Sequence, residues 1–107
     1  MDLDTLHDIL EGTNLPVTYR AWPTEPARHL PPPLPWICYM ETRPDNFAAD
    51  GIVYHSDPRY RIELYTAEKD PTSEQAVEAA LTAAGLFYNK EETFLTDEND
   101  YEIIYEI

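Results

Sequence analysis

The chain has 107 residues, which is the length of a single domain. Hydrophobic residues make up 43% of it and aromatic residues 12%, a globular composition that excludes a disordered chain. The 21 acidic residues outnumber the 7 basic ones and give a formal net charge of −14, so the surface repels nucleic-acid phosphates and anionic lipid. This charge argues against a protein that reads a DNA sequence directly.

The acidic surplus itself has more than one interpretation. No basic residue follows Lys90, whereas seven acidic residues do. The plainest interpretation is a solvated face that keeps the protein soluble. The sharper ones are a surface that keeps DNA from sticking and a surface that meets a basic partner.

The chain carries no sequence signal for export or membrane insertion. Its first ten residues lack the positively charged start of a signal peptide, and no apolar run approaches the ~20 residues of a membrane span. Cys38 is the single cysteine, so no intramolecular disulfide can form, and its apolar neighbours predict a buried thiol. Synthesis in the cytosol is the expectation that follows.

The first predicted element is a short helix over residues 3–10. Asp2 or Asp4 can cap its start, and Gly12 can close its end. Its apolar residues fall on one face, namely Leu3, Leu6, Ile9 and Leu10. His7 lies among them without metal-site spacing around it, which indicates a helix-surface histidine.

A proline-rich segment, residues 23–35, separates two predicted strands at 17–22 and 36–42. It holds six of the ten prolines and has three interpretations: a recognition peptide, a linker between domains, or a stiff crossover. A recognition peptide would need a basic residue where His29 stands, and the residues before Pro23 are too few for a domain. We therefore favour a crossover that delivers the chain into the 36–42 strand, or an arm that leans on a neighbouring subunit.

The 36–42 strand carries large apolar side chains on both faces, which is typical of an interior strand. After a loop at 43–51, the runs 52–56 and 59–67 predict either a hairpin or one bent strand. In the second run the apolar residues recur at every second position from Tyr60. This period predicts a half-buried strand.

The clearest helix covers residues 71–84. Either Asp70 caps it with Pro71 at its first position, or Thr72 caps it within a capping box. Its narrow apolar stripe consists of Val77, Ala80, Leu81 and Ala84. Gly85 is a natural stop after it.

Two strands at 86–95 and 101–107, joined by a turn at 96–100, complete the chain as a hairpin. The order of helix, four strands, helix and two strands predicts an α+β domain in which two helices flank a mainly antiparallel sheet. We expect residues 1–107 to form this single domain, with 23–35 as its proline-rich crossover.

The sequence predicts no enzyme and no catalytic, cofactor-binding or metal-binding residue. It lacks a nucleophile elbow, a phosphate loop, a dinucleotide loop and a zinc-ligand pattern, and its three histidines are scattered. Ser73 is explained by the helix start and Cys38 by burial. Three aspartates in predicted turns do not have the spacing of a calcium loop: Asp45, Asp50 and Asp57.

Three stretches in the C-terminal part of the chain resemble a known family. They are "ELYTAEKDP" at 63–71, "VEAALTAAG" at 77–85 and "FYNKEETFLTDENDYEIIYE" at 87–106. Residues 34–107 resemble the small tail-completion proteins, called tail terminators, of long-tailed phages and prophages of Gram-positive bacteria. The resemblance is one of pattern, since the family has no catalytic signature.

The resemblance implies an α+β fold and a structural role in virion assembly. Six copies of such a protein form a ring on the finished tail tube, stop its growth and present a surface to the connector of the head. The implied partners are further copies of the chain, the major tail tube protein and a head-completion or connector protein, with no membrane involved. The implied location is the tail or neck of the virion, after synthesis in the cytoplasm of the bacterial host. DNA passes through the ring without specific binding, and an acidic lumen would help it pass.

Four apolar residues are our candidates for the seams between subunits of such a ring: Leu30, Leu34, Phe47 and Ile52. Each of them can equally pack a loop onto its own core. The alternative function is an acidic binding module that mimics DNA and occupies a basic nucleic-acid-binding protein, and a small enzyme of unrecognised type is a third. A mimic would bind its partner with steep salt dependence, whereas a ring subunit would depend on apolar contacts.

Overall fold

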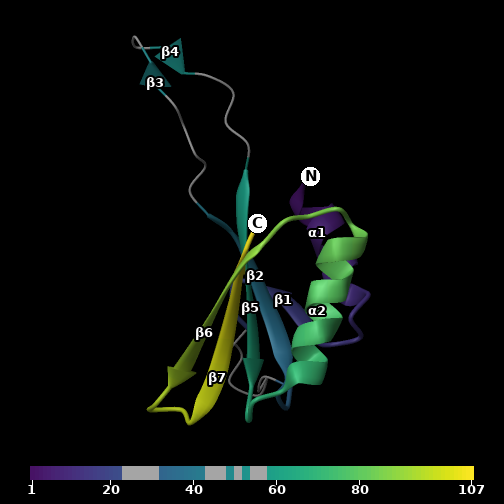
Figure 1. The fold of residues 1–107 in the computed structure, drawn as a ribbon, viewed down its shortest axis with the longest axis vertical. Coiled ribbons are helices and arrows are strands. Elements are labelled where there is room, and N and C mark those ends of the chain that lie inside the picture. The colour runs from purple at the N-terminus through teal and green to yellow at the C-terminus, as the bar shows by residue number, and fades with distance from the viewer. Residues whose placement is uncertain (23–31, 43–47, 50–51, 54–57) are drawn as a thin grey trace.

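The computed structural model describes residues 1–22, 32–42, 48–49, 52–53 and 58–107, and for 48–49 and 52–53 it describes the backbone. In these ranges the elements follow the order α1, β1, β2, β3, β4, β5, α2, β6, β7 (Figure 1). The helices are α1 (Leu3–Glu11) and α2 (Pro71–Ala83). The strands are β1 (Val17–Tyr19), β2 (Trp36–Thr42), β3 (Ala48–Ala49), β4 (Ile52–Val53), β5 (Arg59–Thr66), β6 (Asn89–Leu95) and β7 (Asp100–Glu106).

Five of these strands form one sheet in the order β1-β2-β5-β7-β6. β1 runs parallel to β2, and the other neighbours are antiparallel. Both helices lie on the same face of this sheet (Figure 1). The prediction of an α+β domain with two helices and a mainly antiparallel sheet is confirmed, and the parallel pair is the feature that it did not include. Parallel neighbours need a crossover connection, and residues 20–35 join these two strands.

The core lies between the sheet and the two helices. Every second residue of the central strands points toward the helices, as the period of a strand requires. The buried members of the core are Leu6 and Leu10 of α1, Ile37 and Tyr39 of β2, Tyr60, Ile62 and Leu64 of β5, Val77 and Leu81 of α2, and Ile103 and Tyr105 of β7. The alternation predicted from Tyr60 is confirmed, and β2 is an interior strand between β1 and β5.

Each helix begins at an aspartate, which decides between alternatives that the sequence left open. The Asp2 carboxylate accepts a hydrogen bond from the Thr5 amide at 2.8 Å. The Asp70 carboxylate accepts one from the Ser73 amide at 3.1 Å, with Pro71 at the start of α2. Each cap satisfies a backbone N–H that has no partner within its helix.

Two predicted strands are shorter or paired differently in the structure. The first ends at Tyr19 instead of at residue 22, because Arg20 has a left-handed backbone with a φ of 67°. Ile52–Val53 pairs with Ala48–Ala49 as a separate two-stranded ladder and not with β5. Figure 1 places this ladder away from the five-stranded sheet.

The apolar stripe predicted on the second helix is confirmed in part. Val77 and Leu81 are fully buried, but Ala84 is exposed. Ser73 and Glu74, at the start of the helix, are buried instead. A buried carboxylate needs partners, so this end of α2 is where polar contacts with the sheet are required.

Gly85 provides a test of how α2 ends. It follows the cap residue Ala84 with a left-handed φ of 74°, and an added Cβ would meet no atom within 4 Å. We expect Gly85→Ala to lower the free energy of unfolding by about 1 kcal/mol, because alanine resists this backbone conformation. Gly85→Asn should cost less, since asparagine tolerates it. Thermal unfolding of both variants measures the difference, and a Gly85→Ala protein as stable as the wild type would contradict the argument.

Candidate functional site

The structure places the four predicted seam residues only in part. Leu30 and Phe47 lie outside the described residues, as does the side chain of Ile52. Leu34 is partly buried and precedes the cis peptide bond to Pro35, shortly before β2 begins. The assignment of these residues to subunit seams stays a prediction.

Cys38 and Ser73 both have structural roles, as the sequence predicts. Cys38 is 3% exposed, and burial raises the pKa of its thiol to about 12, with the nearby Glu63 and Glu102 adding to the rise. The thiol therefore stays protonated and unreactive. The Ser73 hydroxyl donates a hydrogen bond to the Asp70 carboxylate at 2.7 Å and belongs to the helix start. Across the described ranges, no group of three or more His, Cys, Asp or Glu side chains is placed to hold a metal ion.

His7 lies on the surface of α1, as the sequence predicted. Its Nδ1 lies 2.9 Å from the Tyr39 hydroxyl, and its Nε2 lies 2.8 Å from a carboxylate oxygen of Glu11. Both ring nitrogens thus have protein partners, and the contact with Tyr39 ties α1 to β2.

A network of ion pairs joins α2 to the sheet. At its centre the Glu74 side chain is only 4% exposed, with Oε2 lying 2.7 Å from Lys69 Nζ and Oε1 lying 2.8 Å from Lys90 Nζ. Lys90 also lies 2.8 Å from Glu78, and Lys69 lies 2.5 Å from Glu92. The network spans the residue before the α2 cap, the first turns of α2 and β6, so it fixes the helix to the C-terminal hairpin.

Burial and the two lysines act on Glu74 in opposite directions. Burial would raise the pKa of this carboxyl, but hydrogen bonds from Lys69 and Lys90 lower it overall. Glu78 behaves in the same way, because Lys90 and the Tyr105 hydroxyl, which donates at 2.8 Å, lower the pKa of its carboxyl against the effect of burial. Both carboxylates are charged at neutral pH and held by opposite charge, which is the arrangement of a structural brace and not of an acid–base pair.

One face of the sheet carries no helix (Figure 1). A second polar cluster lies on that face, because its residues alternate along β5 and β7 with core residues such as Leu64 and Ile103. Glu63 of β5 and Glu102 of β7 are each 9% exposed, and the Tyr65 hydroxyl oxygen lies 3.0 Å from the first carboxyl and 2.8 Å from the second. Arg61 Nε lies 3.0 Å from the other oxygen of Glu63. A tyrosine hydroxyl has one hydrogen and can donate it to one carboxylate at a time. Tyr65 therefore satisfies one of the two carboxyls at a time.

Burial determines which way Glu63 titrates. It raises the pKa of this carboxyl, and the neighbouring Glu102 carboxylate adds to the rise. The hydrogen bond from Tyr65 and the ion pair with Arg61 oppose the rise without reversing it. Burial also raises the pKa of Tyr65, so its hydroxyl keeps its hydrogen. Glu63 is therefore a carboxyl that holds its proton more tightly than a solvated glutamate does.

The feature that stands out on the surface is Phe87, which is 96% exposed. It lies in the connection from α2 to β6, between Leu86 and Tyr88, and both of these neighbours pack against the core. Because successive side chains of a strand-like segment point in opposite directions, packing Leu86 and Tyr88 inward sends Phe87 into solvent. A monomer gains no hydrophobic stabilisation from such a ring, so Phe87 is a candidate contact residue.

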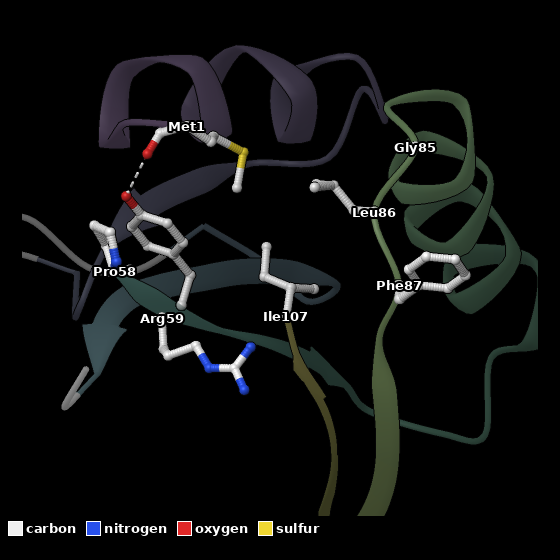
Figure 2. Close-up of a pocket in the computed structure, with 8 residues that line it drawn as sticks. Met1, Pro58, Arg59, Gly85, Leu86, Phe87 and Ile107 are labelled. Atoms are coloured by element: carbon white, nitrogen blue, oxygen red, sulfur yellow. Dashed lines mark hydrogen bonds between the residues drawn. The ribbon is translucent and has the colours of Figure 1, made fainter. Parts of the chain in front are cut away.

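Hollows lie on either side of Phe87. One, of about 350 Å³, is lined largely by apolar side chains (Figure 2). Figure 2 shows Met1, Leu86 and Ile107 turned toward one another around it, with the Phe87 ring on the other side of Leu86. The second, of about 320 Å³, shares Leu86 and Phe87 and extends to Thr82 near the end of α2. An exposed ring between two hollows is able to bind a partner by both inserting and receiving side chains.

A third hollow lies at the opposite end of the sheet, by the β6–β7 turn. Its volume is about 440 Å³, and it is lined by Phe94, Leu95, Thr96, Asp97 and Glu98. Phe94 is 46% exposed, and its ring centroid lies 5.1 Å from that of Tyr101. This end of the molecule therefore combines an aromatic ring with carboxylates.

Sequence reasoning missed Phe87 because it treated residues 86–95 as one strand. The available signal was the run of three large apolar residues, Leu86, Phe87 and Tyr88, directly after the helix stop. In a segment that is covered on one face, three such residues in a row cannot all be buried. The middle residue or its two neighbours must point outward.

Comparisons with family models, with curated proteins and with solved structures found no match for this chain. Among the helices of the described residues, none is long and apolar enough to cross a membrane. The described surface carries exposed aromatic rings beside hollows. The groups of its polar clusters already have partners.

Removing the Glu74 carboxylate tests the ion-pair network. We expect Glu74→Ala to lower the free energy of unfolding by about 2–3 kcal/mol, because Lys69 and Lys90 lose the buried charge that they share. Glu91→Ala, at an exposed position of β6, is the matched control and should change stability little. Urea denaturation measures both variants. If Glu74→Ala were as stable as Glu91→Ala, the network would not hold the helix to the hairpin.

The carboxyl pair predicts a specific pH dependence. A raised pKa means that the folded state holds the proton of Glu63 more tightly than the unfolded state does. Protonated Glu63 therefore adds to the free energy of unfolding at low pH. This contribution is lost as the pH rises from the ordinary pKa of 4.5 through the raised pKa. We expect Glu63→Gln to lack this loss of stability, whereas the exposed control Glu91→Gln should keep it. Thermal unfolding at steps from roughly pH 4 to 8 measures the effect. Parallel stability curves for the wild type and Glu63→Gln would rule out a raised pKa of Glu63 in the folded state.

Proposed function

We propose that this chain is a structural subunit of a long-tailed phage or prophage, a tail terminator that forms a ring of six copies on the tail tube. The observation that carries the proposal is Phe87, which is 96% exposed between two hollows. Aromatic rings of this kind serve as anchors in protein interfaces. The geometry therefore favours a subunit that assembles over an enzyme.

The architecture supports the proposal, because the stretches that carry the family resemblance coincide with helices and strands of the structure. "ELYTAEKDP" covers the end of β5 and the first residue of α2, and "VEAALTAAG" covers the second half of α2 with its stop at Gly85. Residues 87–106 contain the β6–β7 hairpin. These elements agree with the α+β fold that the resemblance implies.

The charge distribution also supports the proposal. Among the described residues, Arg61, Lys69 and Lys90 lie within 3.0 Å of a glutamate and are neutralised there. Exposed carboxylates of the C-terminal hairpin, such as Glu91 and Glu98, remain to give the surface its negative potential. A ring lined with such a surface repels phosphates and lets DNA pass without binding it.

In this proposal the chain is not an enzyme and uses no cofactor. Its partners are further copies of itself, the major tail tube protein on one side of the ring, and a head-completion or connector protein on the other. It acts in the tail or neck of the virion. The seam candidates from the sequence keep their place in the proposal: Leu30, Leu34, Phe47 and Ile52.

Deleting the gene for this chain in the parent phage or prophage tests the proposal. We expect electron micrographs of lysates to show free filled heads beside tails of abnormal length, because nothing stops the tube or joins it to the head. A plasmid copy of the gene should restore complete particles of uniform tail length. Normal virions after deletion would refute the terminator role, and the acidic DNA-mimicking module would then be the better explanation.

A further inference from the structure

The five-stranded sheet ends in two strands of different character. At one edge, β1 is three residues long, and the left-handed backbone of Arg20 follows it directly. At the other edge, β6 is seven residues long and pairs with β7 over its whole length without a bulge. Proteins protect the edges of their sheets with very short strands, prolines or bulges. Shortness protects β1, whereas β6 has none of these three features.

The outer side of β6 is open. Within the described ranges, no strand or helix lies along this side (Figure 1). In an antiparallel ladder every second residue directs its N–H and C=O toward the neighbouring strand, and the residues between direct theirs the other way. Apart from the Leu95 carbonyl, which accepts a hydrogen bond from the Glu98 amide at 3.2 Å, these outward groups have no backbone partner among the described residues. Such a row of groups matches the backbone of one more extended strand.

Two charged side chains of β6 are held away from its edge. Lys90 and Glu92 lie on the helix side of the sheet, where Lys90 pairs with Glu74 of α2 and Glu92 pairs with Lys69. Lysines that extend over an edge protect it from further pairing. Lys90 does not have this role, because its Nζ lies 2.8 Å from Glu74 Oε1.

Glu91 is the charge that remains free on this strand. It lies on the opposite face from Lys90 and Glu92, because side chains alternate along a strand. It is exposed, and no described residue pairs with its side chain. The edge therefore combines unpaired backbone groups with a negative charge.

We propose that β6 accepts an extended segment of a basic partner protein as a further strand of the sheet. The backbone of that segment supplies the missing hydrogen bonds, as in other complexes that form by strand addition. A lysine or arginine of the segment lies opposite Glu91, where side chains of neighbouring strands are about 4.5–5.5 Å apart at Cβ. This contact does not require the tail-terminator role, because it depends on β6 alone.

Charge argues against a second copy of the chain as the added strand. The midpoint of Asn89–Leu95 is Glu92, so antiparallel pairing of two copies over the full strand sets Glu92 opposite Glu92 of the other copy. Parallel pairing in register sets each glutamate beside its own counterpart. Like charges in these positions destabilise a ladder, and each copy also carries a formal net charge of −14. A basic segment meets attraction at the same positions.

Amide hydrogen exchange followed by NMR tests the contact at the backbone. The probe is a synthetic peptide of about eight residues in which lysine alternates with threonine, so that all its lysines share one face of an extended strand. The matched control is the same peptide with every backbone nitrogen methylated, which keeps the charge and donates no backbone hydrogen bond. Each is added at roughly 1 mM, where even a weak contact is populated.

We expect the outward-facing amides of β6 to exchange about fivefold more slowly with the probe, because they gain hydrogen-bond partners. The amides that face β7 and those of β1 should keep their rates. The methylated peptide should protect none of them. Equal protection by both peptides, or no slowing at β6, would overturn the proposal. Slowing of the same amides at higher protein concentration without any peptide would identify a second copy as the occupant and would also overturn it.

Charge reversal tests the position of the basic residue. Glu91→Lys should weaken binding of the probe about fivefold. Glu98→Lys, at an exposed position in the turn after β6, changes the net charge equally and is the matched control, which should weaken binding less. A peptide with glutamate in place of lysine should bind Glu91→Lys better than the wild type. Equal losses from Glu91→Lys and Glu98→Lys would show that net charge alone attracts the probe and would overturn the pairing with Glu91.

Discussion

Both helices of this protein lie on one face of its sheet, and the rest of the structure depends on that constraint. The alternating side chains of the central strands can bury an apolar half against the helices, and for this reason Ile37, Leu64 and Ile103 are fully buried. The other half of the same strands has no helix to cover it. Polar side chains there must find partners within the sheet, as Glu63 and Glu102 do around Tyr65.

The buried polar groups reinforce this layered arrangement at its margins. Glu74 and its lysines connect the start of α2 to β6, and Tyr65 connects two neighbouring strands through their carboxyls. Each cluster joins elements that are distant in the sequence. A shift of one residue in strand pairing would move every such side chain to the opposite face. The clusters therefore favour a single register in addition to contributing stability.

The sequence predicts this structure where the signals are local. The period of the β5 residues and the stop at Gly85 each depend on a few neighbouring residues, and both predictions are confirmed. The sequence offers Asp70 and Thr72 as caps of α2, and the structure selects Asp70. The direction of β1 relative to β2 depends on tertiary pairing, so no local pattern contains it. The burial of Glu74 is similar, because its partner Lys90 comes from a strand that follows the helix.

The candidate contact surface was harder to predict than the fold. Phe87 has the same hydrophobic character as its neighbours, and its exposure becomes evident only once Leu86 and Tyr88 are assigned to the core. The seam residues predicted from the sequence, such as Leu34, are apolar residues whose exposure the sequence alone does not give. Exposure is a property of the whole fold, and for this reason composition and period alone could not rank these residues.

The connection from Gly85 to Asn89 also limits how the length of this chain can vary. Leu86 faces inward, Phe87 outward and Tyr88 inward, so the segment has a fixed phase relative to the sheet that follows. Deleting or inserting one residue there would reverse which side chains face the core. The inward-facing groups of Leu86 and Tyr88 would then be exposed, and the exposed ring of Phe87 would be buried. A change of two residues would preserve the phase. Related chains are thus free to differ in the length of this connection by an even number of residues. The surface that a partner contacts cannot change independently of the core behind it.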